Sequence, residues 1–373
     1  MRIYLDHNAG APLLPQAADA MTAALAWAGN PSSIHAAGRA ARAAVERARR
    51  QVAGLFGEVA DALDQLVFTG SGTEAITLAV AGLAGARPGR VVVPVVEHPA
   101  VHGAVEGLAR AGWGVAAVAV DAHGAIDPAA WATALAAGVD LAIIGAVNHE
   151  LGTVADVVGL AAAARAAGAR VVVDAVAAAG RIDLAPVAAA ADAVVIASHK
   201  LGGPAGVGAV WTAPGVALAL PPAGGPQERG RRPGTENVIG CVGFGAAAAA
   251  VDLGRIPALA ARGARLEAAA LAIPAARVHG AGAPRTGTTV NLGFAGVRGH
   301  TLVIALDLAG VDASSGAACS SGSVAPSPVL LALGLDPEAA RGGLRLSLGP
   351  ATTDAEIDAV AAMLPGLVAR ARR

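Results

Sequence analysis

Lys200 is the residue with the most distinctive chemistry, because it is the only lysine among 27 lysine and arginine residues. Arginine cannot replace an amine, since a guanidinium group stays protonated and is a poor nucleophile. An uncharged amine can condense with a carbonyl group and form a Schiff base. Lys200 follows an apolar stretch, 191–197, and precedes a stretch rich in glycine and proline, 201–207, so we expect it at the carboxyl end of a strand. The alternative is a surface lysine in a chain that otherwise uses arginine.

Cys319 is the second candidate, because it lies in a stretch of serine, glycine and alanine, 314–323. Such a stretch is expected to be an exposed loop, where an unused thiol would be open to oxidation. We therefore expect Cys319 to be functional. Cys241 lies in an apolar stretch, 238–251, and is expected to be a small buried residue. Two cysteines cannot form a four-thiolate zinc site or a disulfide framework, and we predict no metal.

A glycine-rich turn, 70–74, lies between a predicted strand at 66–69 and a predicted helix at 75–83. Such a turn can hold a phosphate group, because its free N–H groups and the helix dipole favour an anion. Gly70, Gly72 and Ala75 also match the dinucleotide fingerprint, with Glu97 as a possible ribose ligand. A nucleotide site is therefore a rival interpretation.

Short apolar strands alternate with helical stretches over the first two thirds of the chain, which is typical of a mostly parallel sheet with helices on both faces. We predict strands at 66–69, 91–96, 115–120, 141–147, 170–173 and 193–197. In this architecture a ligand binds at the carboxyl ends of the strands. The polar residues expected there are Thr73, His98, Asn148, Asp174, His199 and Lys200. Each of these residues alone could be a loop or capping residue. Their chemical types, and not their polarity, indicate a site.

The strand–helix alternation ends near residues 253–257, where we place a domain boundary. We predict a large α/β domain at 13–253 and a smaller α+β domain at 254–373, which residues 1–12 join. The smaller domain is expected to contain helices at 258–272, 301–308, 328–333 and 354–371, and strands near 289–292 and 343–347.

The composition argues against several classes of partner. The chain has 373 residues, of which 55% are hydrophobic, and much of that apolarity is alanine, which favours helices. No apolar run is long enough to span a bilayer, and the first residues lack the pattern of a signal peptide, so we expect a cytoplasmic protein. A net charge of -1 and 2% aromatic residues give no reason to expect binding to nucleic acid or a membrane.

The residues at the strand ends fit the cofactor pyridoxal phosphate. This cofactor needs an amine for its aldehyde, a carboxylate against its ring nitrogen and a cradle for its phosphate. Lys200, Asp174 and the turn at 70–74 meet these needs, and His98 could stack on the ring and transfer protons. A nicotinamide cofactor would leave Lys200, Asp174 and Cys319 without a role.

With these residues assembled, the chain resembles the cysteine desulfurases of the iron–sulfur-cluster and nitrogen-fixation type, in the class V group of fold-type I pyridoxal phosphate enzymes. The resemblance extends over nearly the whole chain, and the motifs follow the family order. They are Tyr4-Leu5-Asp6-His7-Asn8-Ala9, Asn30-Pro31-Ser32-Ser33, Thr73-Glu74, Glu97-His98, Asn148 with Glu150 and Gly152, Val173-Asp174-Ala175, His199-Lys200, Gln227-Glu228, Gly234-Thr235-Glu236-Asn237, Ser314-Ser315-Gly316 with Cys319, and Arg345-Leu346-Ser347-Leu348-Gly349. The resemblance implies a large domain with a mostly parallel seven-stranded sheet and a smaller C-terminal α+β domain.

The resemblance also implies how the cofactor is held. Lys200 would form the Schiff base, His98 would stack on the ring, Asp174 would pair with the ring nitrogen and Asn148 would hydrogen-bond near the ring oxygen. The residues implied on the phosphate side are Gly72, Thr73, Ser198 and His199, with Thr235 reaching the phosphate of the partner subunit across the interface of a homodimer.

For the substrate, L-cysteine, the resemblance implies that Asn30 and Arg345 bind the carboxylate. Cys319 would attack the substrate sulfur as a thiolate, so that alanine is released and a persulfide stays on the enzyme. A sulfur-acceptor or scaffold protein would then receive the sulfur. Without the resemblance, Asn30 is more simply a turn or capping residue.

Two departures from the family pattern affect the cofactor site. Ala177 stands where the family usually has glutamine, and Ala197 where it usually has serine, with Ser198 one position later. Loss of two hydrogen bonds would weaken cofactor binding by a few kcal/mol. A class V enzyme with another substrate, such as selenocysteine or a transamination substrate, and an inactive scaffold protein therefore stay open as alternatives.

Overall fold

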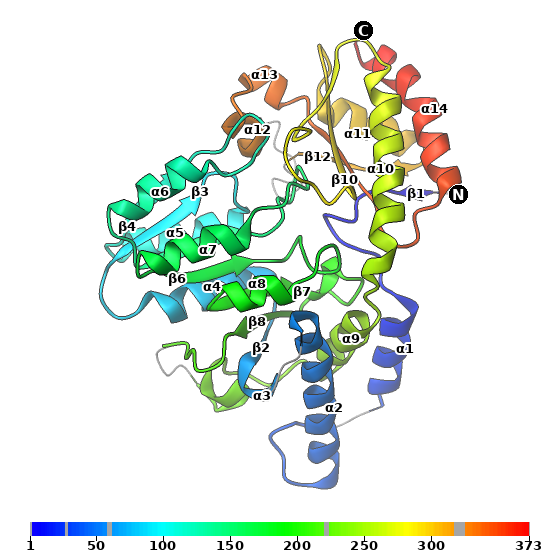
Figure 1. Cartoon of the computed structure of the whole chain (residues 1–373). Coiled ribbons are helices and arrows are strands. Elements are labelled where there is room, and N and C mark those ends of the chain that lie inside the picture. Colours follow the sequence, from blue (N-terminus) through cyan, green and yellow to red (C-terminus); the bar gives the residue numbers. More distant parts are fainter. Residues whose placement is uncertain (1, 27–28, 58–61, 220–223, 317–324, 373) are drawn as a thin grey trace.

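The structure is a computed structural model that describes residues 2–26, 29–57, 62–219, 224–316 and 325–372. Cys319 lies outside the described residues, and so does the rest of the segment 317–324. Figure 1 shows two units, with both termini in the unit that also contains the C-terminal helices.

The larger unit is built on a seven-stranded sheet with the strand order β2-β8-β7-β6-β5-β3-β4. Strand β8 pairs antiparallel with β2 and β7, and the other strands share one direction. The strands are β2 (Leu66–Thr69), β3 (Arg90–Pro94), β4 (Gly114–Val118), β5 (Leu141–Gly145), β6 (Arg170–Asp174), β7 (Ala193–Ala197) and β8 (Gly208–Thr212). The predicted α/β fold with a mostly parallel sheet is confirmed. Pattern reading found six of these strands and missed β8, a strand of five residues that begins at Gly208, directly after the glycine- and proline-rich stretch 201–207.

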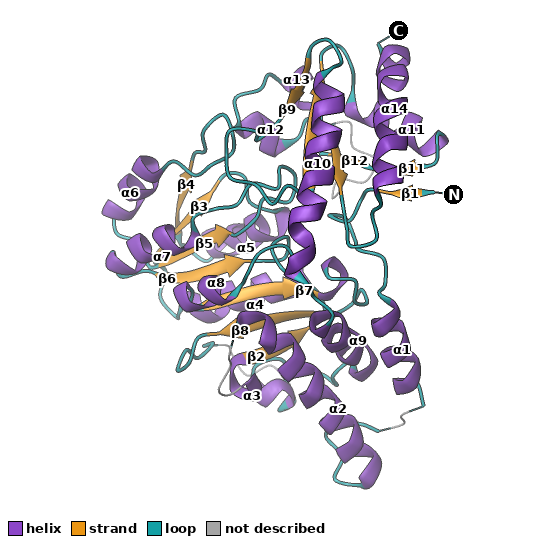
Figure 2. Ribbon diagram, turned by 45° about the vertical axis from the view of Figure 1, so that its right-hand side comes forward, coloured by secondary structure: helices purple, strands orange, loops and turns teal. Residues whose placement is uncertain are grey.

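Helices cover both faces of this sheet (Figure 2). The helices of this unit are α1 (Pro15–Ala24), α2 (Ala36–Ala53), α3 (Ala62–Gln65), α4 (Gly72–Ala84), α5 (Pro99–Arg110), α6 (Pro128–Ala136), α7 (Val157–Ala166), α8 (Ala185–Ala190) and α9 (Val238–Ala249). Short 3-10 helices are η1 (Gly54–Phe56), η2 (Ser198–Lys200), η3 (Gln227–Gly230) and η4 (Leu253–Arg255).

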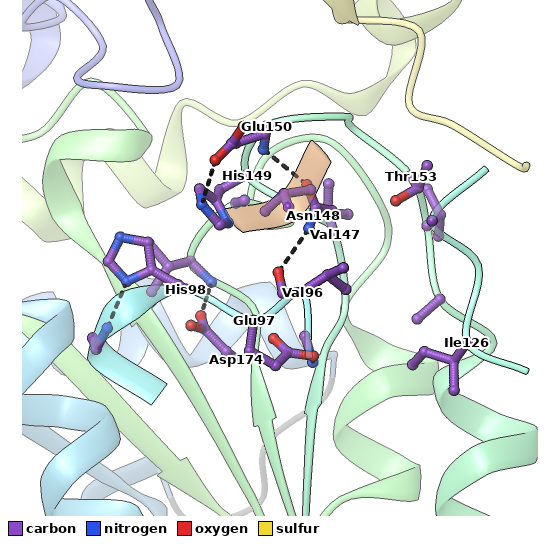
Figure 3. A pocket seen from close by; sticks show the side chains of 18 of the residues that line it. Val96, Glu97, His98, Ile126, Val147, Asn148, His149, Glu150, Thr153 and Asp174 are labelled. Carbon is purple, nitrogen blue, oxygen red and sulfur yellow. Dashed lines mark hydrogen bonds and ion pairs between the residues drawn. The ribbon is translucent and has the colours of Figure 1, made fainter. Parts of the chain in front are cut away.

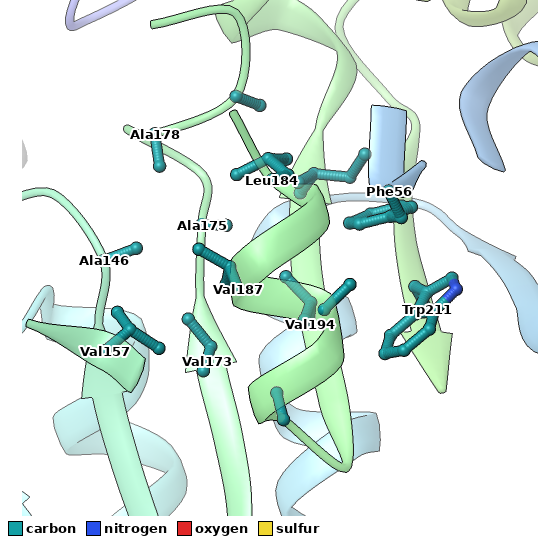
Figure 4. Packing of buried hydrophobic residues seen from close by; sticks show 14 of the residues in the cluster. Phe56, Ala146, Val157, Val173, Ala175, Ala178, Leu184, Val187, Val194 and Trp211 are labelled. Carbon is teal, nitrogen blue, oxygen red and sulfur yellow. The ribbon is translucent and has the colours of Figure 1, made fainter. Parts of the chain in front are cut away.

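Successive strand residues point to opposite faces, and this separates two apolar layers. On one face, Val67, Val93 and Ile143 pack with helices α4 and α5. On the other face the strands pack with helices α2, α6, α7, α8 and α9. Figure 4 shows part of this second layer, where Val173 and Val194 of the sheet lie near Val187 of α8. Packing on both faces fixes the strand ends, where the polar residues lie.

The second unit contains a four-stranded sheet with the order β12-β13-β10-β9 and a two-stranded pair of β1 with β11. Its strands are β1 (Ile3–Tyr4), β9 (Ala276–Val278), β10 (Thr289–Phe294), β11 (Val311–Asp312), β12 (Ser314–Ser315) and β13 (Leu344–Ser347). Its helices are α10 (Ile256–Leu271), α11 (Gly299–Leu308), α12 (Pro328–Ala332), α13 (Pro337–Ala340) and α14 (Asp354–Ala371). Leu5 packs in the same apolar cluster as Leu266, Leu346 and Leu364. The domain boundary at residue 253 stays a prediction.

None of the described helices alone is both long and apolar enough to cross a membrane. Helix α9 and the stretch Leu253–Leu271, bent by 54° at their junction, have the length and composition together.

Candidate active site

A cavity of about 1180 Å³ lies at the carboxyl ends of β3, β5, β6 and β7. Both units contribute to its wall. The larger unit contributes His98, Asn148, Asp174 and Lys200, and β13 of the second unit contributes Arg345. Figure 3 shows part of this wall, with His98 after β3 and Asp174 at the end of β6.

Lys200 ends the short helix η2, which follows directly after β7. Its Nζ atom donates hydrogen bonds to the carbonyl oxygen of Asn8, at 2.5 Å, and to that of Ala9, at 2.9 Å. These two residues also line the cavity. The N-terminal segment therefore holds the amine at the cavity wall, as expected for a residue at the end of a strand.

Asp174 is the last residue of β6, and its Oδ1 atom accepts a hydrogen bond from the main-chain N–H of Val176 at 2.9 Å. Burial raises the pKa of the Asp174 carboxyl to about 6, against the opposing effects of the Val176 N–H and the charge of Lys200. Asp174 is therefore ionised at neutral pH and lies in the same cavity as the lysine amine. A buried carboxylate beside an amine is the donor set that a protonated pyridine ring and its aldehyde require.

Glu97 is a second carboxyl group at the cavity, and sequence reasoning gave it only the role of a possible ribose ligand. Its Oε1 atom accepts a hydrogen bond from the N–H of Gly145 at 2.8 Å, between β3 and β5. Burial, opposed by the hydrogen bond from Gly145 N–H and assisted by the charge of Asp174, raises the pKa of Glu97 to about 8. Glu97 is therefore neutral at neutral pH, and this end of the cavity carries one negative charge instead of two.

His98 is the N-cap of α5, and its Nδ1 atom accepts a hydrogen bond from the N–H of Ala100 at 3.1 Å. In the neutral imidazole the proton is therefore on Nε2. Burial, followed by the charge of Lys200, lowers the pKa of His98 to about 4. His98 is thus a neutral ring with one N–H to donate.

His149 lies edge-on to His98, with ring centroids 5.0 Å apart and an interplanar angle of 79° (Figure 3). Burial, followed by the charge of His98, lowers the pKa of His149 well below its usual value. Sequence reasoning missed this residue, although it lies between Asn148 and Glu150, which both belong to the recognised motif.

The Asn148 amide organises the loop after β5. Its Nδ2 atom donates to the carbonyl oxygen of Val96 at 2.9 Å, and its Oδ1 atom accepts from the N–H groups of Glu150 and Leu151. The side chain thus ties this loop to the end of the neighbouring strand and lies at the cavity wall.

The glycine-rich turn has the geometry of a phosphate cradle. Helix α4 begins at Gly72, three residues earlier than predicted, and Ser71 caps it by accepting a hydrogen bond from Glu74 N–H. Ser71, Gly72 and Thr73 line the cavity. A Cβ atom on Gly72 would lie 3.2 Å from Cβ of Ala197, so a side chain here would crowd the floor of the cradle. An exposed helix N-terminus with no side chain in the way fits a phosphate group.

His199 also lines the cavity, and burial lowers its pKa to about 4. His199 is therefore an uncharged polar group on this wall at neutral pH.

Arg345 is buried between the two units. Its NH1 atom donates to the carbonyl oxygen of His149 at 3.0 Å, and its NH2 atom donates to Oδ1 of Asp6 at 3.0 Å. Its Nε atom has no hydrogen-bond partner among the described residues. A guanidinium group held in place at the cavity wall supplies a positive charge that favours a carboxylate.

Three predicted site residues that the structure describes, Asn30, Ser198 and Thr235, are not among the residues that line the cavity. The Ser198 side chain is fully buried and lies against Gly203, so its contact with the cofactor stays a prediction. Thr235 is exposed. Asn30 is exposed as well, and its Oδ1 atom accepts a hydrogen bond from Ser32 N–H, as in a turn. Cys319 lies outside the described residues, as stated above.

Comparison with known proteins identifies the family. The model of the family "Aminotransferase class-V" matches residues 3–360. A cysteine desulfurase of Cereibacter sphaeroides is 41% identical over 376 residues, which cover 100% of this chain and 97% of that protein. A cysteine desulfurase of Klebsiella pneumoniae is 39% identical over 376 residues, covering 100% and 94%. The solved structure of a NifS-like protein superposes with a TM-score of 0.90 at 27% identity and covers 99% of this chain and 100% of that one. The chain belongs to the aminotransferase class-V family.

Proposed function

We propose that the protein is a pyridoxal phosphate-dependent cysteine desulfurase, which converts L-cysteine to L-alanine and leaves the sulfur as a persulfide on Cys319. The observation that carries this proposal is that Gly316 and Ala325, which flank the segment containing Cys319, line the same cavity as Lys200 and Asp174. The thiol therefore belongs to a segment whose flanking residues lie at the wall of this cavity. The full-length similarity to cysteine desulfurases supports the same activity.

When bound, pyridoxal phosphate supplies an aldehyde that captures the substrate amine and a ring that accepts electrons from the substrate carbons. Lys200 would hold the aldehyde, and the ionised Asp174 would keep the ring nitrogen protonated. The N-terminus of α4 at Gly72 and Thr73 would bind the phosphate, with His199 beside it.

The side chains around the substrate have complementary tasks. Arg345 binds the substrate carboxylate, and His98 holds a proton on Nε2 that it can give to a substrate carbon. The Cys319 thiolate attacks the substrate sulfur, so that the carbon–sulfur bond breaks as a sulfur–sulfur bond forms. The thiol hydrogen of the substrate is balanced by the hydrogen gained in the methyl group of alanine.

We also propose a homodimer, in which Thr235 reaches the phosphate bound by the partner subunit. Thr235 is exposed and does not line the cavity of its own chain, which is consistent with a role across an interface. The persulfide then requires a sulfur acceptor, which takes the outer sulfur and returns Cys319 to the thiol.

Replacing Cys319 with alanine tests the proposal. We expect the Cys319→Ala protein to keep its cofactor absorbance and to lose alanine and sulfide release from cysteine. The matched control is Cys241→Ala, because Cys241 is 1% exposed and burial raises the pKa of its thiol, so it cannot serve as the nucleophile. Unchanged turnover of cysteine by Cys319→Ala would contradict the persulfide mechanism and favour another class V reaction.

A further inference from the structure

Glu150 is a buried carboxyl group that the proposed reaction does not use. Its side chain is 1% exposed, and its Oε2 atom accepts a hydrogen bond from the Ser327 hydroxyl at 2.7 Å. Ser327 Oγ in turn accepts a hydrogen bond from the N–H of Leu330 at 3.1 Å and so caps helix α12. Glu150 thus holds the residue at which this helix begins.

The same carboxyl group lies against Gly316. A Cβ atom on Gly316 would be 2.6 Å from Oε2 of Glu150, so the main chain of this residue passes directly beside the carboxyl group. Gly316 precedes the segment 317–324 and Ser327 follows it closely, which means that one side chain contacts both ends of the segment that carries Cys319. The main chain of the second unit also holds both ends, through Gly316 N–H to Gly343 and Ser327 N–H to Ala340.

On its other side, Glu150 is tied to the substrate and cofactor residues. Its N–H donates to Oδ1 of Asn148 at 2.9 Å, and its Oε1 atom lies 3.8 Å from Nε2 of His149. The carbonyl oxygen of His149 accepts a hydrogen bond from Arg345, whose strand pairs with β12 immediately before Gly316. The loop 148–150 therefore links the cavity wall to the ends of the cysteine-bearing segment.

Two neighbours of the Glu150 carboxyl group partly offset the effect of its burial. Burial raises the pKa of its carboxyl group, and the hydroxyl of Ser327, followed by the charge of Arg345, opposes the rise. A buried carboxyl group with a hydroxyl donor persists only where its geometry is well fixed, because loss of the donor leaves a desolvated acceptor unsatisfied.

We propose that Glu150, acting through Ser327 and Gly316, is a positioning residue for sulfur transfer, which fixes both ends of the segment containing Cys319 relative to the substrate site. This inference rests on the proposed function. The proposal assigns two tasks to different residues of one site. Other residues hold the cofactor and the substrate carboxylate, and Glu150 positions the ends of the segment that carries the thiol.

The test compares persulfide formation with cysteine binding in the holoenzyme. We expect Ser327→Ala to slow persulfide formation on Cys319 in a single turnover by about tenfold or more, since loss of about 1.4 kcal/mol corresponds to a factor of ten. We expect the cofactor absorbance and the spectrally measured dissociation constant for cysteine to be unchanged. Ser327→Thr, which keeps the hydroxyl, should restore the rate, and Glu150→Gln, which keeps an acceptor oxygen, should fall between.

Thr212→Val is the matched control, because it also removes a buried hydroxyl. This hydroxyl donates a hydrogen bond of 3.2 Å to the carbonyl oxygen of Gln65, and neither residue lines the cavity. An equal loss of cysteine binding and persulfide formation in Ser327→Ala, or a parental rate in that variant, would overturn the inference. Failure of the proposed function itself gives a different result, since the parent protein would then form no persulfide on Cys319.

Discussion

Ala197 and Ser198 are consecutive residues that face opposite sides at the end of β7. Ala197 lines the cavity and lies against Gly72, whereas the Ser198 hydroxyl lies against Gly203 and has no hydrogen-bond partner among the described residues. Successive side chains alternate in extended chain, so a serine shifted by one position cannot replace a serine at position 197. This orientation of the two side chains is a physical reason to expect weaker cofactor binding than with a serine at position 197.

Restoring the hydroxyl at position 197 should strengthen cofactor binding. A new hydrogen bond of about 1 kcal/mol would lower the dissociation constant of pyridoxal phosphate in Ala197→Ser by about fivefold. Ser198→Ala is the control and should leave this constant unchanged. The measurement is a fluorescence or absorbance titration of the cofactor-free protein, and a larger effect of Ser198→Ala than of Ala197→Ser would contradict the assignment of faces.

The pKa of Glu97 predicts a pH dependence of stability in the cofactor-free protein. Because the pKa rises from 4.5 to about 8 on folding, the folded state holds this proton more tightly than the unfolded state. The stability that this proton gives is present below pH 4.5 and is lost as the pH rises through 8, by at most about 1.4 kcal/mol per pH unit.

Glu97→Gln removes this dependence and keeps an acceptor for Gly145 N–H. The thermal midpoint of the variant should therefore exceed that of the parent by an amount that grows from pH 5 to pH 8 and is constant above. Glu106→Gln, at an exposed position of α5, should follow the parent at every pH. A difference between Glu97→Gln and the parent that does not depend on pH would show that Glu97 is ionised in the folded protein.

The buried ion pair of Arg49 and Glu228 predicts a large change in stability. Two nitrogens of Arg49 donate to the two carboxylate oxygens of Glu228 at 2.6 and 2.8 Å, and Phe68 N–H donates to the same carboxylate. Arg49→Met leaves this carboxylate buried without its cation, so we expect a loss of about 3–5 kcal/mol in the free energy of unfolding measured with urea.

A solvent-exposed pair supplies the comparison for that experiment. Arg255 and Asp252 are both more than half exposed, and Arg255→Met should change the free energy of unfolding by only about 0–1 kcal/mol. Similar losses in Arg49→Met and Arg255→Met would mean that the Arg49 pair contributes little to the fold.

The sequence predicted the sheet well because local patterns determine short apolar strands and the polar residues that end them. Lys200, Asp174, Asn148 and His98 come to one cavity, as expected for strands that run in the same direction. Their individual roles toward the cofactor stay predictions. Strand β8 was missed, since it is short and follows directly on a stretch rich in glycine and proline, which is typical of a loop.

Other features depend on contacts that sequence patterns do not contain. The direction in which the Ser198 side chain points depends on its position, because a shift by one residue at the end of β7 moves a side chain to the opposite side. The edge-on pair of His98 and His149 joins two loops 51 positions apart, and a pattern read along the chain cannot show that they meet. Thr235 does not line the cavity of its own chain. Its proposed role is at the phosphate of the partner subunit, which a single chain does not contain.

The central claim is that the amine of Lys200 holds pyridoxal phosphate as a Schiff base, and reduction with borohydride tests it most directly. Reduction converts the Schiff base into a stable secondary amine, and because Lys200 is the only lysine, one peptide identifies it by mass spectrometry. We predict a pyridoxyl group on Lys200 in the purified holoenzyme and loss of both label and turnover in Lys200→Ala. An unlabelled Lys200 in a protein that still releases alanine from cysteine would contradict the account.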